Sequence, residues 1–348
     1  MINVGLVGFG FAGRTFHAPV ISAVSGLRLA AIAQRTGDEA SQIYPQARLV
    51  RSVDEMLSDH KIDVIVIATP NQSHFPLAKQ CLEQERHVVV DKPFTTTSAE
   101  ARTLVQLAQA RNKVLSVYHN RRWDGDFQTV RKLLAEGSVG RVVIYESHFD
   151  RFRPELKKGA WREKNDPGSG VLFDLGSHLI DQAFTLFGVP DAIEADVRIE
   201  RSGAAVDDAF DVTLFYPDKR ALLRATMLAN ISGARFTLHG TSGSYVKHGM
   251  DPQEEALKGG HAPGDSASGI ESRGNWGELT LAVAGKNFAR RVPTLAGDYR
   301  GFYENVRDAI EKGAPLAVKP VDALNVIIGL ELALQSSREG RKVEWPAV

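Results

Sequence analysis

The chain has 348 residues, of which 43% are hydrophobic and 24% are charged, and its 42 lysines and arginines balance its 42 aspartates and glutamates. This length is too great for one ordinary hydrophobic core, and the composition is typical of globular proteins, so we expect two domains. Zero net charge excludes the global field that would recruit nucleic acid or an anionic membrane surface. No apolar run reaches about 18 residues, and the N-terminal MINVGLVGFG enters a strand pattern at once, so we expect neither a membrane span nor a signal peptide.

The chain contains a single cysteine, Cys81, which cannot form an internal disulfide. It falls within the apolar pattern of a predicted helix, where a thiol packs rather than reacts. A lone structural thiol is typical of the reducing cytoplasm, where we expect the protein to reside.

Residues 1–120 alternate short apolar runs with helical patterns. The apolar runs, which we predict to be strands, are NVGLVGFG, LRLAAIAQR, IDVIVIATP, RHVVVDKP and KVLSVYH. Helical patterns lie between them, for example over residues 75–84 and 98–111. Because continuous apolar strands that alternate with helices form parallel sheets covered on both faces, this part predicts a doubly wound Rossmann domain, an α/β fold.

The pattern changes after about residue 120, where strands follow one another without crossover helices. After a helix over 126–136, we predict strands over residues 141–149, 192–201, 209–216, 221–228 and 236–240. Residues 247–278 are rich in Gly, Ser, Asp and Pro and predict a long excursion, and two helices over 299–312 and 321–338 close the chain. Residues 121–348 therefore predict an α+β domain built on a large, open, mostly antiparallel sheet.

A glycine-rich turn after the first strand predicts a dinucleotide site. The G-x-G-x-x-G pattern comprises Gly8, Phe9, Gly10, Phe11, Ala12 and Gly13 and opens a predicted helix. Gly8 permits the tight turn, Gly10 lets the backbone approach a pyrophosphate, and Gly13 allows close packing of helix on strand. The alternative is a purely structural turn, which the βαβ context disfavours because the helix start also supplies free N–H groups for phosphates.

The end of the second strand indicates which dinucleotide is bound. NAD-binding domains usually place Asp or Glu about 20 residues beyond the glycines. Here the corresponding positions hold Gln34, Arg35 and Thr36. With no carboxylate at these positions to repel a 2′-phosphate, Arg35 can pair with that phosphate, helped by Thr36, so we expect NADP(H) rather than NAD(H). The alternative is an ordinary surface arginine that stacks on adenine.

VVVDKPF places Asp91, Lys92 and Pro93 just past the carboxyl end of a predicted parallel strand, where such sheets bind ligands. Lys92 could be an ordinary surface charge, but three valines before it and a stiffening proline after it indicate a lysine that is held in place. It can donate a hydrogen bond to a substrate oxygen and stabilise an alkoxide-like transition state.

The stretch VLFDLGSHLIDQAFTLF, residues 171–187, predicts an amphipathic helix with a polar stripe. At about 100° per residue, its apolar residues share one broad arc, and Asp174, His178 and Asp181 lie within roughly a 60° stripe on the opposite side. Ser177, Gln182 and Thr185 flank the stripe, and periodicity alone predicts a solvated face. The nucleotide fingerprint and the strand-end lysine upstream favour a stripe that is half site and half surface.

Together these motifs resemble the glucose–fructose oxidoreductase/inositol dehydrogenase/MocA (Gfo/Idh/MocA) family of nicotinamide-dependent dehydrogenases. The resemblance covers the full chain and rests on GLVGFGFAG, ATPNQSH (68–74), DKP (91–93), YHNRRWD (118–124) and GSGVLFDLGSHLID (168–181). DKP stands where the family more often has E-K-P, a conservative departure. FHAP (16–19), HNRRWDGDF (119–127) and ESHFDRFRP (146–154) resemble a narrower branch that includes NADP-dependent scyllo-inositol dehydrogenases.

The resemblance implies that Lys92, Asp174 and His178 are the catalytic residues. His178 would exchange the hydroxyl proton of the substrate, because imidazole titrates near neutrality. Asp174, one helical turn earlier, would orient the imidazole or hold a substrate hydroxyl, and both would face the nicotinamide across the domain cleft. Lys92 would hydrogen-bond the reacting oxygen. We expect no metal, because Asp-x-x-x-His offers two ligands and no third is convincingly placed.

Residues after other strand ends complete the predicted site. We expect Thr69, Pro70, Asn71 and His74, with Asp91 and Lys92, to border the nicotinamide and its ribose, although His74 could instead cap the next helix. The predicted substrate-facing residues are His119, Asn120, Arg122, Trp161 and Arg162. The arginines and the tryptophan could equally pack the domain interface.

We therefore expect an NADP-dependent dehydrogenase of a cyclic polyol or sugar. One alternative is an NAD(P)-assisted glycosidase, which would release sugar without net consumption of NADP. The other is a non-catalytic nucleotide-sensing regulator, which retention of Lys92, Asp174 and His178 disfavours. The exposed face of the second sheet needs a cover, and the resemblance implies a homodimer or homotetramer formed through that sheet.

Overall fold

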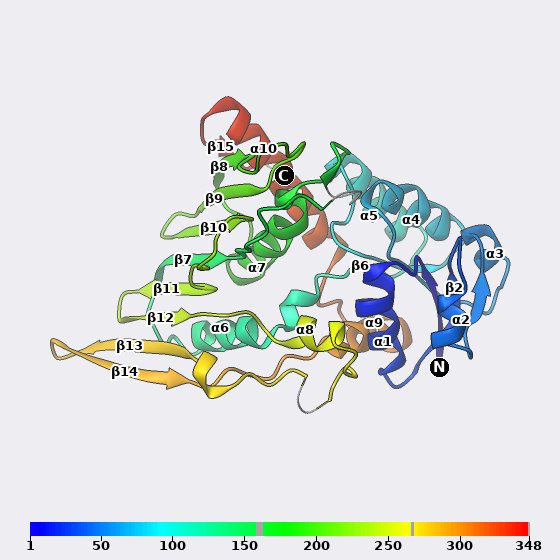
Figure 1. Cartoon of the computed structure of the whole chain (residues 1–348), viewed down its shortest axis with the longest axis horizontal. Coiled ribbons are helices and arrows are strands. Elements are labelled where there is room, and N and C mark those ends of the chain that lie inside the picture. Colours follow the sequence, from blue (N-terminus) through cyan, green and yellow to red (C-terminus); the bar gives the residue numbers. More distant parts are fainter. Residues whose placement is uncertain (158–162, 266–267, 347–348) are drawn as a thin grey trace. The chain divides into compact units, whose positions relative to one another are not determined.

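The computed structural model describes residues 1–157, 163–265 and 268–346, which form two compact units (Figure 1). The first unit comprises Met1–Trp123, Pro252–Gly269 and Asp298–Ile327, and the second comprises Asp124–Asp251, Ile270–Gly297 and Ile328–Val348. The chain therefore returns twice to its first unit after leaving it, in segments that sequence reasoning assigned to the second domain.

The first unit contains a six-stranded, all-parallel sheet, as the apolar runs predict. Its strands are β1 (Ile2–Val7), β2 (Leu27–Ala33), β3 (Arg48–Val50), β4 (Val64–Ile67), β5 (His87–Val90) and β6 (Leu115–Val117). They lie in the order β3-β2-β1-β4-β5-β6. β1 and β4 are neighbours at the centre of the sheet, and the strand order reverses between them. Ligands of such sheets bind at this reversal, outside the carboxyl ends of the strands.

Helices cover this sheet and give the Rossmann fold its two outer layers. They are α1 (Ala18–Ser22), α2 (Glu39–Ile43), α3 (Val53–Leu57), α4 (His74–Glu83), α5 (Ser98–Ala110), α8 (Gln253–Lys258) and α9 (Arg300–Lys312), with the short turns η1 (Gly13–His17), η2 (Asn71–Ser73) and η3 (Asn120–Trp123). α1 packs on β2 and α9, whereas α4 packs on α5, β4 and β5. A capping box between Thr97 and Glu100 begins α5.

The second unit is built on a nine-stranded sheet. Its strands are β7 (Val142–His148), β8 (Ala192–Arg198), β9 (Ala209–Phe215), β10 (Arg220–Thr226), β11 (Phe236–Gly240), β12 (Gly243–Lys247), β13 (Gly277–Val283), β14 (Lys286–Val292) and β15 (Val343–Glu344). They lie in the order β14-β13-β12-β11-β7-β10-β9-β8-β15. Neighbours are antiparallel except for β7 and β10, so the predicted mostly antiparallel sheet is confirmed.

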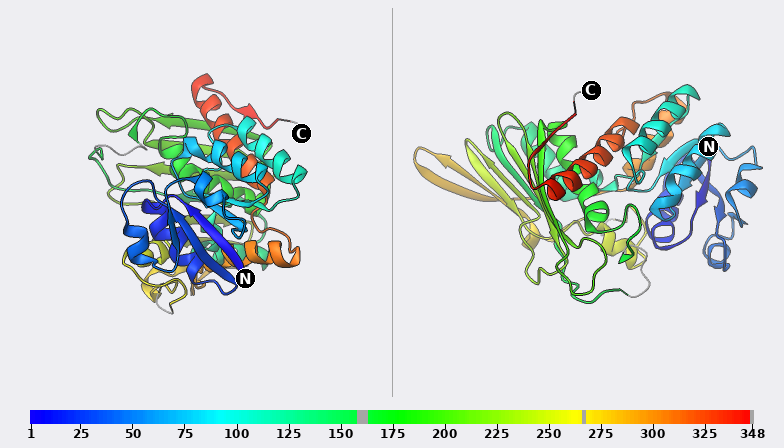
Figure 2. Two further views of the ribbon diagram at one scale, coloured as in Figure 1. Left: turned by 90° about the vertical axis from the view of Figure 1, so that its right-hand side faces the viewer. Right: turned by 90° about the horizontal axis from the view of Figure 1, so that it is seen from above.

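The helices of the second unit lie on one face of this sheet, as Figure 2 shows for α7 and the end of α10. They are α6 (Gly125–Ala135), α7 (Ser177–Phe187) with the preceding π-turn η5 (Leu172–Gly176), and the later part of α10 (Pro320–Glu339); the short turn η6 (Arg273–Asn275) precedes β13. Aromatic rings pack in this core: the Tyr145 ring on β7 lies 5.5 Å from that of Phe187 on α7 and 6.1 Å from that of Phe236 on β11, centroid to centroid. The opposite face carries a row of paired charges in which Arg224 contacts Glu146 and Asp211.

The hairpin of β13 and β14 projects from one edge of the second sheet (Figure 1). Sequence reasoning predicted no strand over residues 277–292, because every residue of β14 except Val292 is exposed and no alternation marks a buried face. Val283 and Phe288 are among the exposed apolar side chains of this hairpin.

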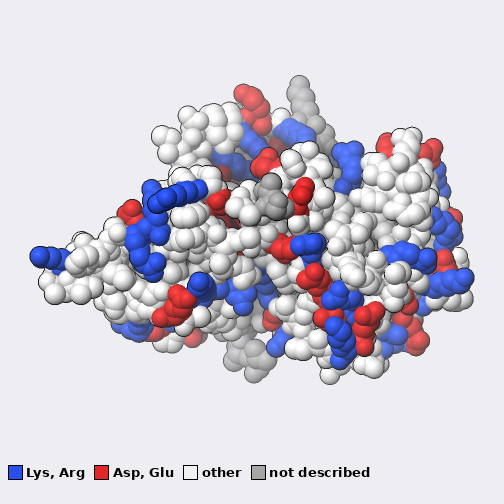
Figure 3. Space-filling view, turned by 90° about the horizontal axis from the view of Figure 1, so that it is seen from below, with Lys and Arg blue, Asp and Glu red and all other residues white. Residues whose placement is uncertain are grey.

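Acidic and basic side chains are interspersed on the surface drawn in Figure 3, in keeping with a chain of zero net charge. Among the described residues, every helix is too short or too polar to cross a bilayer.

Candidate active site

The glycine turn has the geometry that a dinucleotide requires. Gly8 has φ +99°, and a Cβ there would lie 2.5 Å from the Ala68 carbonyl oxygen. A Cβ on Gly13 would lie 2.0 Å from the Gly8 carbonyl oxygen, so both glycines are needed by the fold. Gly10 differs, because a Cβ there meets no protein atom within 4 Å. The open space beside Gly10 fits close approach of a pyrophosphate to the backbone.

The loop after β2 presents Arg35 and Thr36 to solvent. Arg51 holds this loop: its guanidinium donates to the Gln34 carbonyl at 3.1 Å and the Gly37 carbonyl at 2.6 Å. Within the described residues, Arg35 itself forms no hydrogen bond or ion pair, which leaves its charge available to a ligand.

Glu39 is a carboxylate at this loop that sequence reasoning missed. It accepts a hydrogen bond from the side-chain amide of Gln34, which in turn accepts from the Ala40 N–H at 3.0 Å. Its own backbone N–H and the Gln34 amide hold the pKa of Glu39 below its ordinary value. Sequence analysis missed Glu39 because it lies five residues after Gln34, outside the positions where a ribose-binding acid is expected.

The ends of β4 and β5 are joined by His74, which is fully buried. Its Nδ1 lies 2.8 Å from the Pro93 carbonyl oxygen and its Nε2 lies 2.9 Å from the Thr69 carbonyl oxygen. Burial lowers the pKa of His74, against the effect of Asp91 and these carbonyls. His74 is the first residue of α4, but its ring contacts carbonyl oxygens of the two loops rather than capping that helix. Pro70 precedes the η2 turn of Asn71, which is buried.

Asp91 and Lys92 directly follow β5, as predicted. The Asp91 carboxylate accepts the Lys92 backbone N–H at 2.8 Å and lies 3.6 Å from Nε2 of His17. Burial acts to raise the pKa of Asp91, but its neighbours, first His17 and then Lys92 and His74, hold that pKa below its ordinary value. Asp91 is therefore an anion beside the candidate catalytic lysine.

The residues after β6 are buried within the first unit. His119 and Asn120 are 1% and 8% exposed. Arg122 donates to the Ala317 carbonyl oxygen at 2.5 Å and lies 3.4 Å from an Asp322 carboxylate oxygen. These contacts tie η3 to the segment before α10 and to the first turn of α10. A substrate role for the three residues stays a prediction. Trp161 and Arg162 lie outside the described residues.

In the second unit, Asp174 lies on η5 and His178 on α7. Arg151, just after β7, lies 3.8 Å from an Asp174 carboxylate oxygen and 5.0 Å from the Phe149 ring centroid. The Phe149 and His178 rings lie 6.4 Å apart. Arg151 was missed from the sequence; its position shortly after a predicted strand end, within ESHFDRFRP, was the available signal.

Asp207 fixes the start of this helix. Its carboxylate accepts the Leu172 N–H at 2.7 Å and its carbonyl accepts the Val171 N–H at 2.9 Å. Gly170, with φ +89°, lies so close that a Cβ there would fall 2.0 Å from Asp207. Burial raises the pKa of Asp207 to about 6.

The polar stripe of α7 is not a solvated face, so this part of the sequence interpretation is wrong. Asp181 and His178 are 2% and 5% exposed, and Ser177 and Gln182 are fully buried. Gln182 accepts a hydrogen bond at 2.9 Å from Arg235, a buried arginine on the strand side of the core. Buried partners from the sheet therefore replace the water that periodicity predicts.

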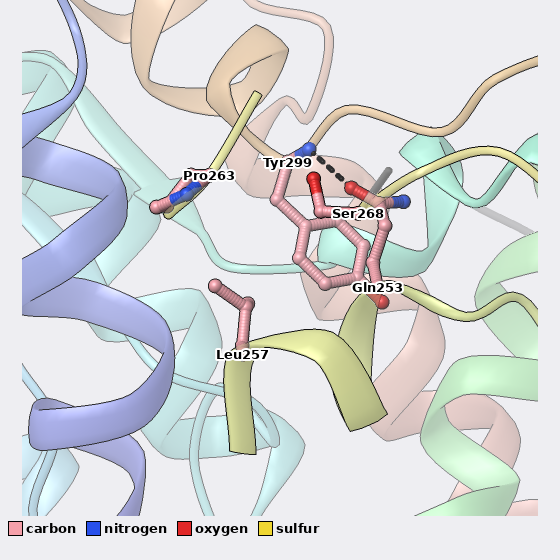
Figure 4. Close-up of a pocket in the computed structure, with 5 residues that line it drawn as sticks. All are labelled: Gln253, Leu257, Pro263, Ser268 and Tyr299. Carbon is pink, nitrogen blue, oxygen red and sulfur yellow. Dashed lines mark hydrogen bonds between the residues drawn. The ribbon is translucent and has the colours of Figure 1, made fainter. Parts of the chain in front are cut away.

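Two further features of the structure bear on ligand binding. Among the described residues, no group of three or more His, Cys, Asp or Glu side chains is placed to hold a metal ion. A narrow hollow in the first unit is lined by Gln253, Leu257, Pro263, Ser268 and Tyr299 (Figure 4). There the Tyr299 N–H donates to the Gln253 side-chain oxygen at 2.8 Å, and none of the predicted site residues takes part.

Comparison with known proteins matches both halves of the chain. Residues 2–119 match the model of an oxidoreductase family's NAD-binding Rossmann fold, and residues 131–345 match that of the family's C-terminal alpha/beta domain. The chain is 44% identical to the uncharacterized oxidoreductase YdgJ of Escherichia coli K12, over 97% of this chain and 96% of that one.

Two further likenesses come from Bacillus subtilis. The chain is 36% identical to scyllo-inositol 2-dehydrogenase (NADP(+)) IolW of strain 168, over 98% of this chain and 95% of that one. The solved structure of the oxidoreductase yvaA superposes with a TM-score of 0.96 at 35% identity, covering 99% of this chain and 98% of that one.

Proposed function

The chain belongs to the Gfo/Idh/MocA family of NAD(P)-binding oxidoreductases, and from this premise we propose that it is an NADP-preferring dehydrogenase that oxidises a secondary alcohol of a cyclic polyol or sugar. The observation that carries the proposal is the reactive set of Lys92, Asp174 and His178, in a chain whose first unit has an open glycine turn at Gly10. A nucleotide-sensing regulator has no need of an acid/base histidine.

Each residue has a proposed role in the reaction. The dinucleotide, when bound, supplies the hydride acceptor. His178 takes the hydroxyl proton of the alcohol as the carbon-bound hydrogen leaves with its electron pair. The Lys92 ammonium donates to the reacting oxygen and offsets the negative charge that develops on it. Asp174, one turn before His178 and paired with Arg151 at 3.8 Å, orients the imidazole or holds a substrate hydroxyl.

Three observations support a preference for NADP. Arg35 is exposed, and within the described residues its charge is uncompensated, as a 2′-phosphate ligand requires. Thr36 lies exposed beside it. The Glu39 carboxylate, which would repel a phosphate, is engaged by Gln34. The name of the relative IolW, a scyllo-inositol 2-dehydrogenase that uses NADP(+), supports both this preference and the polyol substrate class.

The proposal includes a self-associating protein in the cytoplasm. On the β13–β14 hairpin, Val283 and Phe288 are 55% and 57% exposed, and a second copy packed on this sheet would remove both side chains from water. Cys81 is buried, and its burial raises the pKa of the thiol to about 12, which suits a structural thiol in a reducing compartment. Light scattering at micromolar concentration tests the assembly, and a monomer would end that part of the proposal.

A polyol and sugar panel with NADP and with NAD, read by absorbance of the reduced nicotinamide, tests the activity. Lys92→Met and His178→Asn should each lower turnover by about a hundredfold to ten-thousandfold with NADP binding intact. Lys61→Met and His239→Asn, at exposed positions of the first and second units, are matched controls. Sugar release without accumulation of reduced nicotinamide would indicate the glycosidase instead, and unchanged turnover in either variant would refute the assigned roles.

A further inference from the structure

His17 is a buried histidine that the glycine fingerprint does not explain. It ends η1 and is 0% exposed. Its Nδ1 lies 2.6 Å from the Tyr303 hydroxyl on α9, and its Nε2 lies 3.6 Å from an Asp91 carboxylate oxygen. The Tyr118 ring packs over it with centroids 4.4 Å apart. Three segments far apart in sequence therefore converge on one imidazole inside the first unit.

The chemistry of its partners determines which ring nitrogen of His17 carries the proton. Burial keeps the pKa of Tyr303 well above its ordinary value, so its hydroxyl retains its proton and can donate to Nδ1. The imidazole then carries its own proton on Nε2, which faces the carboxylate of Asp91. The opposite tautomer would turn a nitrogen lone pair toward that carboxylate, which electrostatic repulsion disfavours.

Asp91 is the anion that favours this tautomer of His17. The charged or titratable groups that act on it or are acted on by it are His17, His74, Lys92 and Tyr303. Its carboxylate also accepts the backbone N–H of Lys92 at 2.8 Å. A carboxylate that accepts a backbone N–H forms a strong, short hydrogen bond, so Asp91 restrains the chain at the residue that carries the ammonium.

The other side of Lys92 is restrained as well. His74 lies 2.8 Å from the carbonyl oxygen of Pro93, the next residue, and 2.9 Å from that of Thr69 at the end of β4. The backbone before Lys92 is thus bonded to the side chain of the neighbouring Asp91, and the backbone after it contacts His74 from another segment. The attraction between Asp91 and Lys92 also favours the ammonium form of the lysine.

We propose that His17 and Tyr303 are positioning residues of the oxidoreductase reaction, which hold Asp91 as a carboxylate and through it fix the backbone and charge of Lys92. This inference rests on the role proposed above for Lys92. It assigns a function to the histidine of the FHAP motif and to a tyrosine 286 residues away.

Activity measurements of His17 variants form the first test. His17→Leu removes the hydrogen bond to Tyr303 and the 3.6 Å contact with Asp91, and should lower kcat about tenfold to hundredfold, while the Kd for NADP changes less than about twofold. His17→Gln keeps an acceptor for Tyr303 and an N–H for Asp91, and should recover most of that loss. Tyr303→Phe should fall between them. Tyr216→Phe, which removes a buried tyrosine hydrogen bond in the second unit, is the control and should keep full kcat.

The pH profile supplies a readout that mere loss of packing would not move. In Asp91→Asn the negative charge beside Lys92 is gone, so the pH above which kcat declines should move to lower values. Equal profiles for Asp91→Asn and the unaltered protein would overturn the proposal. So would full kcat in His17→Leu, provided that Lys92→Met is inactive; an active Lys92→Met would instead refute the proposed function.

Nitrogen NMR of histidine-labelled protein shows which ring nitrogen of His17 carries the proton, and it needs no measurement of turnover. In the unaltered protein the ring proton of His17 should be on Nε2 and not on Nδ1, and Tyr303→Phe should shift the Nδ1 resonance. A ring protonated on Nδ1 in the unaltered protein would overturn the inference whatever the substrate proves to be. If His17→Leu fails to fold, His17→Gln and Tyr303→Phe carry the test, because both preserve the volume of the buried cluster.

Discussion

Asp207→Asn offers a quantitative test of how the helix that carries Asp174 and His178 is held. The asparagine side-chain oxygen can still accept the Leu172 N–H that Asp207 accepts at 2.7 Å, so the helix start is preserved. What the substitution removes is the charge. Burial raises the pKa of Asp207 from 3.8 to about 6, and this change corresponds to about 3 kcal/mol.

The sign follows from linkage between proton binding and folding. Because the folded state binds the Asp207 proton more tightly than the unfolded state, the stability from this group is full below about pH 4 and is lost as the pH rises through about 6. About 1.4 kcal/mol of that loss falls between pH 5 and pH 8. The asparagine variant has no such loss. The free energy of unfolding of the variant minus that of the unaltered protein should therefore be about 1.4 kcal/mol larger at pH 8 than at pH 5.

Urea denaturation at pH 5, 6, 7 and 8, followed by circular dichroism, measures this difference. Asp166→Asn, which removes an exposed carboxylate from the loop before the same helix, is the matched control and should differ from the unaltered protein by a constant amount. A difference for Asp207→Asn that stays flat between pH 5 and pH 8 would refute the reasoning. A difference that grows toward low pH would show that the ionised form is the stabilising one.

Three further substitutions test other parts of the structure. Gly10→Ala should raise the Kd for NADP about tenfold or more by calorimetry and leave Tm unchanged, because its Cβ meets only the space proposed for the pyrophosphate; a lower Tm would contradict this. Arg35→Ala should raise KM for NADP about tenfold and spare NAD, and Arg51→Gln should reduce the same discrimination less; equal effects on both cofactors would argue against the phosphate role. Lys247→Met leaves the buried Glu271 carboxylate without the ammonium now 2.7 Å away and should cost about 3–5 kcal/mol in urea denaturation, whereas a loss below about 1 kcal/mol would show that water reaches the pair.

The first sheet was predictable because its strands are buried on both faces. Runs such as Val64–Ile67 and Val88–Val90 are wholly apolar, and that pattern alone indicates a parallel sheet between helices. The glycine turn and the residues after each strand follow from the same logic, because parallel strands end at a common edge. β14 was not predicted for the opposite reason: it is exposed on both faces, so its sequence shows no alternation of apolar and polar residues.

Sequence analysis also fails for side chains whose hydrogen-bond partners are remote in sequence. Periodicity on α7 predicts water around Gln182, whereas the structure supplies Arg235, 53 residues later. Arg235 also donates to the Ser147 hydroxyl at 2.8 Å and lies 4.3 Å from the Phe236 ring, so the core accommodates a cation. No local pattern encodes such a pairing, because the residues meet only after the nine-stranded sheet has formed.

The two sets of proposed catalytic residues share one physical arrangement. In each, a short motif supplies the reactive group, and a partly buried carboxylate accepts the backbone N–H at which that motif begins: Asp91 for Lys92, and Asp207 for Leu172 on the turn of Asp174. A carboxylate does this better than a neutral side chain because its hydrogen bond is charge-assisted. It is itself costly to bury, which is why Asp91 has histidines around it and why Asp207, with fewer compensating charges, has a raised pKa. A chain could therefore keep every residue of the reactive motifs and still lose rate, if the groups that stabilise these carboxylates were changed.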